Sequence, residues 1–277
     1  MPDPKPPLAP PPFAVLGWFE RYAFRLVRFF NQGTGARLGA LWQQHMLEPF
    51  VLRFVSRRLQ VHGLEQLQGL PAGAPILLVS NHRTFFDQFV IATLLQRAPG
   101  QRRRCSFPVR ANFFYENPVG LLICMVLSGG SMFPPFFRSA EKMPFNKFGL
   151  ALLIDKLRGP GQLVGFHPEG KRNQGPDPYE LLPAQPGAGE LALKARPLVV
   201  PAFVSGLSNG VFAELKANLR GVRPVLVVFG APVDLSAFPA ETRLSHHKRC
   251  ADLLALRIRE LGQEEKALRN QLPPPAA

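Results

Sequence analysis

Cysteine and acidic residues are scarce in this chain. Its 277 residues include 3 cysteines, which are widely spaced and form no C-x-x-C pair. We therefore expect neither a disulfide framework nor a structural zinc site. The few cysteines instead favour a protein of a reducing compartment. The sequence contains neither G-x-G-x-x-G nor G-x-x-x-x-G-K-[ST], so it lacks the common nucleotide-binding fingerprints.

The shortage of acidic residues leaves a strongly basic chain. Asp and Glu number 19 against 33 Lys and Arg, for a net charge of +14, and hydrophobic residues make up 46%. That composition excludes a wholly disordered chain and a multi-span membrane protein. Arginine outnumbers lysine and suits bidentate recognition of phosphate. The charge predicts an anionic partner, which could be nucleic acid, an anionic membrane surface or a phosphorylated substrate.

Composition shifts divide the chain into four predicted segments. They are a disordered Pro-rich tail (1–12), an N-terminal helical membrane-interface segment (13–58), an α/β domain (59–268) and a flexible tail (269–277). The first residues lack the charged-then-apolar order of a signal peptide.

Residues 13–30 predict an amphipathic helix. Arg21, Arg25 and Arg28 share one face, and an apolar face lies opposite, made by Val15, Leu16, Phe19, Ala23, Leu26, Val27 and Phe30. At roughly 27 Å the helix nearly matches a bilayer, but its charged residues oppose crossing. We expect it to lie in the membrane interface, which predicts a peripheral protein on the cytoplasmic face of a membrane. The alternative is a helix packed on its own domain with the arginines in water. A second helical stretch, about 37–58, has a predicted kink at Pro49.

From residue 75 onward, short apolar runs alternate with helical ones. Strands are predicted at 75–80, 106–110, 162–166, 198–204 and 224–230, and helices at 84–98, 146–158 and 241–267. This alternation predicts an α/β fold with a mixed, largely parallel sheet flanked by helices. The apolar stretch 117–130 is too short for a confident transmembrane helix, and whether it enters the membrane stays open.

The first candidate site is SNHRTFFD (80–87), which joins a predicted strand to a predicted helix. If the chain turns after His82, Asp87 can reach back to the imidazole. A carboxylate on one ring nitrogen fixes the tautomer of a histidine base and supports the imidazolium that forms. The motif alone is weak, and a solvated histidine beside a surface aspartate is the plainer interpretation.

Three further blocks follow in the sequence. FHPEGKRN (166–173) carries Glu169, Lys171 and Arg172 at a turn that could hold phosphate or could be an ordinary basic turn. MFPPFFRS (132–139) places Arg138 after an apolar run, and VVPAFVSG (199–206) has Pro201 inside a strand, which predicts an edge or a bulge.

Taken in order, the four blocks resemble the glycerolipid acyltransferase family, typified by 1-acylglycerol-3-phosphate acyltransferase. The family's N-H-x-x-x-x-D block stands here as Asn81-His82…Asp87, and its second block as Gly130…Phe133…Arg138. The third runs from His167 to Asn173, and the short V-P block is Val200-Pro201. The resemblance covers roughly residues 60–260.

The resemblance implies an O-acyltransferase of phospholipid biosynthesis. The acyl donor is an acyl-CoA or acyl-carrier-protein thioester, and no metal or bound cofactor is required. The acceptor is a lysophospholipid or glycerol phosphate, first of all 1-acylglycerol-3-phosphate. In the roles that the resemblance implies, His82 is the general base and Asp87 orients it; Arg138, Glu169, Gly170 and Arg172 bind the acceptor with added charge from Lys171, and Pro201 shapes the acyl-chain side.

Departures from the family pattern keep alternatives open. Lys171 replaces the usual threonine, His167 the usual aromatic residue, and the second block is more loosely spaced. These differences bear on the acceptor, so a related membrane enzyme with a non-phosphatidate acceptor is one alternative. The others are a basic nucleic-acid-binding protein, a non-catalytic membrane-surface protein and a thioester hydrolase.

Overall fold

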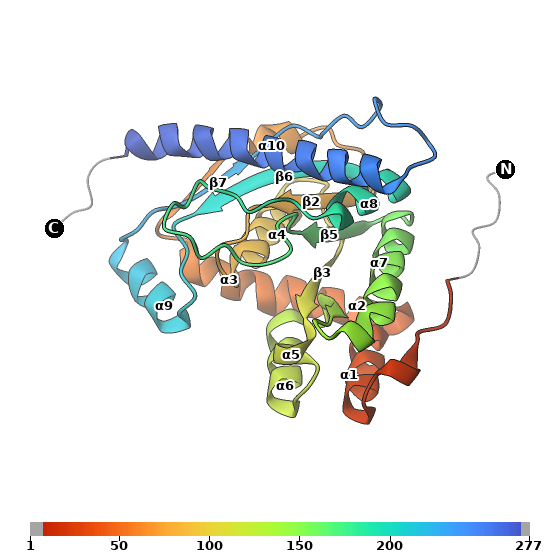
Figure 1. Cartoon of the computed structure of the whole chain (residues 1–277). Helices are drawn as coiled ribbons and strands as arrows, with labels where there is room; N and C mark the ends of the chain where they lie inside the picture. Colours follow the sequence, from red (N-terminus) through yellow and green to blue (C-terminus); the bar gives the residue numbers. More distant parts are fainter. Residues whose placement is uncertain (1–7, 273–277) are drawn as a thin grey trace.

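A seven-stranded sheet forms the centre of the molecule in the computed structural model, which describes residues 8–272 (Figure 1). The strand order is β1-β7-β6-β2-β5-β3-β4, and all neighbours are parallel except β6 and β7. The strands are β1 (Leu59–His62), β2 (Ile76–Ser80), β3 (Arg104–Arg110), β4 (Met132–Phe136), β5 (Gln162–Phe166), β6 (Leu198–Ser205) and β7 (Val225–Phe229). The predicted mixed, largely parallel sheet is confirmed.

Helices cover both faces of this sheet. They are α1 (Trp18–Phe29), α2 (Gly33–Trp42), α3 (Glu48–Val55), α4 (Asp87–Arg97), α5 (Ala111–Phe114), α6 (Pro118–Ser128), α7 (Met143–Leu157), α8 (Pro186–Ala195), α9 (Val211–Arg220) and α10 (Leu244–Asn270). A π-helical turn, Gln43–Leu47, joins α2 to α3, and Pro49 lies in the first turn of α3.

The central strands are buried on both sides, because successive residues point to opposite faces. In β2, Leu77 and Val79 pack with aliphatic side chains of α8 and α10, and we call this side the closed face. Ile76 and Leu78 pack on the opposite side with a cluster rich in phenylalanine from α1, α4 and α7. We call this second side the open face.

Helix α1 is part of the open-face core. Ala23, Phe24 and Val27 are buried, and the ring of Phe24 contacts those of Phe133 and Phe145 at centroid distances of 5.3 and 5.0 Å. Ala23 and Val27 belong to the face that the sequence assigned to lipid. That assignment is not confirmed for these residues, because β4 and α7 cover them.

A different stripe of α1 is left in solvent. Trp18 is 80% exposed, and Tyr22 and Phe29 are also exposed. These three residues lie on a flank of the helix, between its arginine face and its apolar face. The flank, rather than the predicted apolar face, is therefore the side of α1 available to a partner.

The structure extends the last helix beyond its predicted end. Helix α10 runs through Asn270, two residues into the segment predicted as a tail. At the other end, Leu8 packs against the open-face core. The remaining parts of the two predicted tails, 1–7 and 273–277, lie outside the described residues. Within residues 8–272, every helix is too short or too polar to span a bilayer.

Candidate functional site

The first and third sequence blocks meet at one edge of the sheet. Strands β2 and β5 are parallel neighbours in which Val79 pairs with Phe166, so the loops that follow them leave side by side. Asn81 fixes the first loop, since its side chain donates to the Val204 carbonyl at 2.8 Å and accepts from the Val204 amide at 2.9 Å. Polar groups from two strand ends thus gather where ligands of open α/β sheets usually bind.

The loop after β2 brings Asp87 back to His82. Helix α4 begins at Asp87 itself rather than near Thr84, and the intervening turn places Asp87 Oδ2 3.3 Å from His82 Nδ1. The carboxylate is 1% exposed and accepts from the Arg83 and Thr84 amides, each at 2.7 Å. These bonds hold a buried acceptor at the imidazole, as the spacing predicted.

Glu169 holds this loop through hydrogen bonds to the backbone. One carboxylate oxygen accepts from the His82 amide and the other from the Leu182 amide, both at 2.8 Å. The side chain is 4% exposed, and burial raises its pKa. Both oxygens accept from backbone amides, and Glu169 is not among the lining residues of the cavity described next, so the structure shows Glu169 bracing the loop. Its contact with the acceptor stays a prediction.

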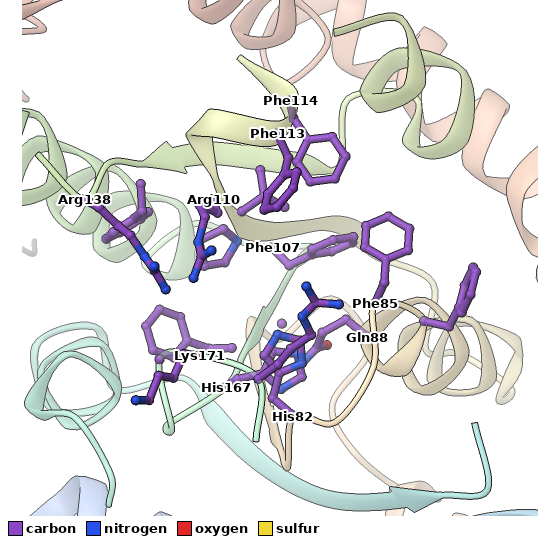
Figure 2. Close-up of a pocket in the computed structure, with 18 of the residues that line it drawn as sticks. His82, Phe85, Gln88, Phe107, Arg110, Phe113, Phe114, Arg138, His167 and Lys171 are labelled. Carbon is purple, nitrogen blue, oxygen red and sulfur yellow. The ribbon is translucent and has the colours of Figure 1, made fainter. Parts of the chain in front are cut away.

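A cavity of about 570 Å³ opens in front of His82 (Figure 2). Its walls are mainly aromatic, with Phe85, Phe86, Phe107, Phe113, Phe114, Phe136, Phe137 and Phe166 among the lining residues. Its volume and apolar lining suit a small lipid, with a few polar groups to fix its orientation.

Cationic side chains line the same cavity. Arg138, Lys171 and Arg172 were predicted from the sequence, and the structure brings all three to it. Arg172 Nη1 donates to Asn209 Oδ1 at 2.9 Å, which ties it to the loop before α9. Gly170 also lines the cavity at φ +68°, a turn conformation that favours glycine.

Arg110 is a cavity residue that sequence reasoning missed. It is the last residue of β3, and Figure 2 shows its guanidinium on the same side of the cavity as that of Arg138. The available signal was its place at the end of a predicted strand, and no motif marked it. Four cations therefore line the cavity, and no aspartate or glutamate of the described residues is among its lining residues.

His167 lies directly on His82. The two imidazole rings stack with centroids 3.8 Å apart and planes within 6° of parallel. Burial, and then the neighbouring His82, hold the pKa of His167 well below its usual range. No pattern in the sequence indicated that these two histidines would stack.

Pro201 lies away from the cavity. It is buried in β6, an interior strand, and pairs with Val79 of β2. The predicted edge or bulge is wrong, because β6 has a strand on either side and its register with β2 runs through Pro201 without a shift. Pro201 sits where β7 ends, and its carbonyl accepts from the Gly230 amide at 2.9 Å. A missing amide is tolerated there because the β6–β7 ladder stops at Ala202 and Phe229.

Comparison with known proteins decides the family. Residues 58–205, more than half of the chain, match the family described as Acyltransferase. The chain belongs to the acyltransferase family. It is similar to human 1-acyl-sn-glycerol-3-phosphate acyltransferase beta, with 27% identity over 215 residues that cover 77% of this chain and 70% of the human protein.

A solved structure supports the fold. The crystal structure of the 1-acyl-sn-glycerophosphate (LPA) acyltransferase PlsC from Thermotoga maritima matches with a TM-score of 0.53 and 18% identity. The match covers 90% of this chain and 95% of that one, so it extends beyond residues 58–205. The resemblance recognised in the four sequence blocks is confirmed, and the family identifies the protein as an O-acyltransferase.

Proposed function

We propose that this acyltransferase moves a fatty acyl chain from a thioester to the free hydroxyl of 1-acylglycerol-3-phosphate. The observation that carries the proposal is the His82–Asp87 pair at an aromatic cavity lined by Arg110, Arg138, Lys171 and Arg172. The name of the human relative supports this acceptor.

His82 is the proposed general base. Its Nδ1–H points to Asp87, which leaves Nε2 to take the proton from the acceptor hydroxyl as its oxygen attacks the thioester carbonyl. When the tetrahedral intermediate collapses, the thiolate leaves and takes the proton back from His82. The products are an ester and a free thiol. Asp87 stabilises the transient imidazolium and fixes the tautomer.

The cations are the proposed site of the acceptor phosphate. Arg138 and Arg172 were assigned this role from the sequence, and Arg110 joins them because it lines the same wall as Arg138. Charge-assisted hydrogen bonds to phosphate suit guanidinium groups, and Lys171 adds charge at the rim. The phenylalanines are the proposed surface for acyl chains.

Two donors remain candidates, acyl-CoA and acyl carrier protein. A thioester is already activated, so the proposed reaction uses no metal and no bound cofactor. Asp87 and Glu169, the carboxylates nearest His82, are both engaged in hydrogen bonds to backbone amides.

We also infer that the protein docks on anionic membranes as a peripheral protein, on the cytoplasmic face. Exposed apolar side chains on α1, α2 and α6 support this: Trp18, Tyr22, Phe29, Leu38, Leu41, Trp42, Val119, Leu122, Ile123 and Val126. The surface is continuous, since Trp42 Nε1 donates to the Val126 carbonyl at 2.9 Å and Asn31 to the Gly130 carbonyl at 2.7 Å. Figure 1 shows α1, α5 and α6 at one end of the molecule. A contiguous apolar patch beside arginines suits an anionic bilayer.

Acyl transfer by the purified protein tests the proposed function. The acceptors are 1-acylglycerol-3-phosphate, glycerol 3-phosphate, lysophosphatidylcholine and monoacylglycerol, each with acyl-CoA and acyl carrier protein donors. We expect the highest kcat/KM with 1-acylglycerol-3-phosphate. A higher kcat/KM with an unphosphorylated acceptor would replace it with the non-phosphatidate alternative, and thioester cleavage without any transfer would indicate a hydrolase.

A further inference from the structure

The stacked pair His82–His167 is a feature of this chain that the four family blocks do not predict. His167 stands where the family pattern has another aromatic residue, and it directly follows β5, the strand beside β2, which leads into His82. Its ring lies 3.8 Å from that of His82 and nearly parallel to it. In Figure 2 the two rings overlap at the floor of the cavity.

A hydrogen bond to the backbone tethers the ring of His167. His167 Nδ1 lies 3.1 Å from the Ser80 carbonyl oxygen and 3.3 Å from the Ser80 hydroxyl. A carbonyl oxygen only accepts, so Nδ1 carries a hydrogen, and in the neutral ring Nε2 then carries none. This bond fixes the tautomer of His167 and the plane of its ring.

Buried polar groups support the tether from behind. Gln88 is 3% exposed, and its Nε2 donates to the Ser80 hydroxyl at 3.3 Å. The neighbouring Gly165 leaves room for it, since a Cβ there would meet Gln88 Oε1 at 2.3 Å. Ser80 thus links a buried amide to the His167 ring.

His82 needs such support because packing alone leaves its ring free on one side. Its side chain is 21% exposed, and Asp87 contacts it only through Nδ1. One hydrogen bond in the ring plane sets the tautomer but allows the ring to tilt. A second ring stacked on its face removes the tilt, because tilting would break the contact between the two rings.

The charge of the pair also favours the proposed reaction. His82 becomes an imidazolium when it takes the hydroxyl proton, and an uncharged ring stacked on a cation stabilises it. Burial keeps His167 neutral, as does the proximity of His82. Among the charged groups near the pair, Asp87 on α4 and Glu169 on the loop after β5 accept hydrogen bonds from His82, and Arg83 follows His82 in the chain. The cations that line the same cavity as the two rings are Arg110, Arg138, Lys171 and Arg172.

We propose that His167 is a positioning residue for the reaction, and that its ring, tethered to the Ser80 carbonyl, holds the plane of the His82 imidazole. The inference rests on the proposed role of His82 as the base. It assigns His167 no contact with the transferred proton.

Two substitutions at His167, by side chains of similar size, distinguish the effect of the stacked ring from that of the hydrogen bond to Ser80. His167→Phe keeps a ring face on His82 and loses the hydrogen bond, whereas His167→Leu loses both. We expect kcat of acyl transfer to fall about tenfold to a hundredfold in His167→Leu, with the acceptor KM within twofold of wild type, because the base is misoriented while the binding site is intact. His167→Phe should recover most of this loss.

Each other outcome counts against the proposal in a defined way. If His167→Leu keeps wild-type kcat, or if its loss is mainly in KM, His167 does not position the base. If His167→Phe loses as much activity as His82→Ala, His167 transfers a proton itself. Near-normal activity of His82→Ala would instead overturn the proposed function, so the two failures are distinguishable.

Spectroscopy of the folded protein tests the tether without relying on activity. We expect the ¹⁵N resonances of His167 at pH 7 to show a neutral ring protonated at Nδ1, assigned by comparison with His167→Phe. A ring protonated at Nε2, or a charged ring, would contradict the hydrogen bond to the Ser80 carbonyl. Circular dichroism and the unfolding temperature of both variants show whether an activity loss reflects unfolding.

Discussion

The closed face of the sheet is covered by α8 and α10, whose aliphatic side chains pack densely, whereas the helices on the open face leave aromatic side chains in solvent. On α10, Leu244 and Leu256 are the exposed large apolar residues. Helices α1, α2 and α6 together expose ten large aromatic and aliphatic residues, and such clusters mark binding surfaces. One sheet therefore supports a stabilising layer on one side and a binding layer on the other. Substitutions on the closed face should lower the stability of the protein, whereas substitutions on the open face should lower its activity or its membrane binding.

The largest effect is expected at His82 itself. His82→Ala removes the proposed base, and we expect the rate to fall by about 10²- to 10⁴-fold with the fold intact. His246→Ala, at a half-buried histidine in the first turn of α10, is the matched control and should keep wild-type activity. Steady-state acyl transfer measures both. If the rate of His82→Ala stays within twofold of the wild-type rate, the reaction does not take place at the proposed site on the open face.

A closed-face substitution should act on stability instead. Leu254 of α10 is fully buried, and Leu254→Ala should lower the free energy of unfolding by about 2–5 kcal/mol because a cavity replaces packed methyl groups. Chemical denaturation measures this loss. Activity per folded molecule should stay at the wild-type value, and a selective fall in kcat would show that the two faces are coupled.

Glu169 supports both the fold and the loop that carries His82. Its substitution should therefore lower both the stability of the protein and its activity, each by a moderate amount. Glu169→Ala leaves the buried His82 and Leu182 amides without their acceptor, at a cost of about 1–3 kcal/mol in the free energy of unfolding. The loosened loop should also lower kcat. The acceptor KM serves as the discriminating measurement, since a selective rise in KM would return Glu169 to the predicted acceptor-binding role.

The smallest effect is expected on membrane binding. Trp18→Ser with Leu122→Ser should weaken sedimentation with anionic liposomes by roughly tenfold or more, because two apolar side chains no longer leave water. Leu244→Ser with Leu256→Ser makes the same change on α10 and should have no effect. Added salt should weaken wild-type binding without abolishing it, because salt screens only the arginine contribution. Equal sedimentation of the two double variants would place the membrane contact elsewhere.

The sequence predicted the buried strands well because their apolar runs are bounded by turns. β2, β5, β6 and β7 were found within a residue at either end. β4 was missed, since Pro134 and Pro135 argue against a strand, and edge position in the sheet is what tolerates them. The short β1 is only partly buried and gave no apolar run.

Orientation was harder to predict than periodicity. The pattern of α1 identified an apolar face but could not say that β4 and α7 would cover it. The same limit hid Arg110, whose role depends on β3 ending beside the cavity, and the stacking of His167 on His82, which depends on the pairing of β2 with β5. His82 and Asp87 were predictable because their contact is local in the chain.

Discrimination of the acceptor phosphate tests the central claim most directly. The measurement is the ratio of kcat/KM for 1-acylglycerol-3-phosphate to that for monoacylglycerol, in wild type and in Arg138→Ala and Arg172→Ala. A charge-assisted hydrogen bond contributes about 1.5–3 kcal/mol, so each substitution should lower this ratio by roughly ten- to a hundredfold with little change in donor KM. If both variants keep the wild-type ratio, the cavity does not hold the phosphate, and the account of the open face as the acceptor site is contradicted.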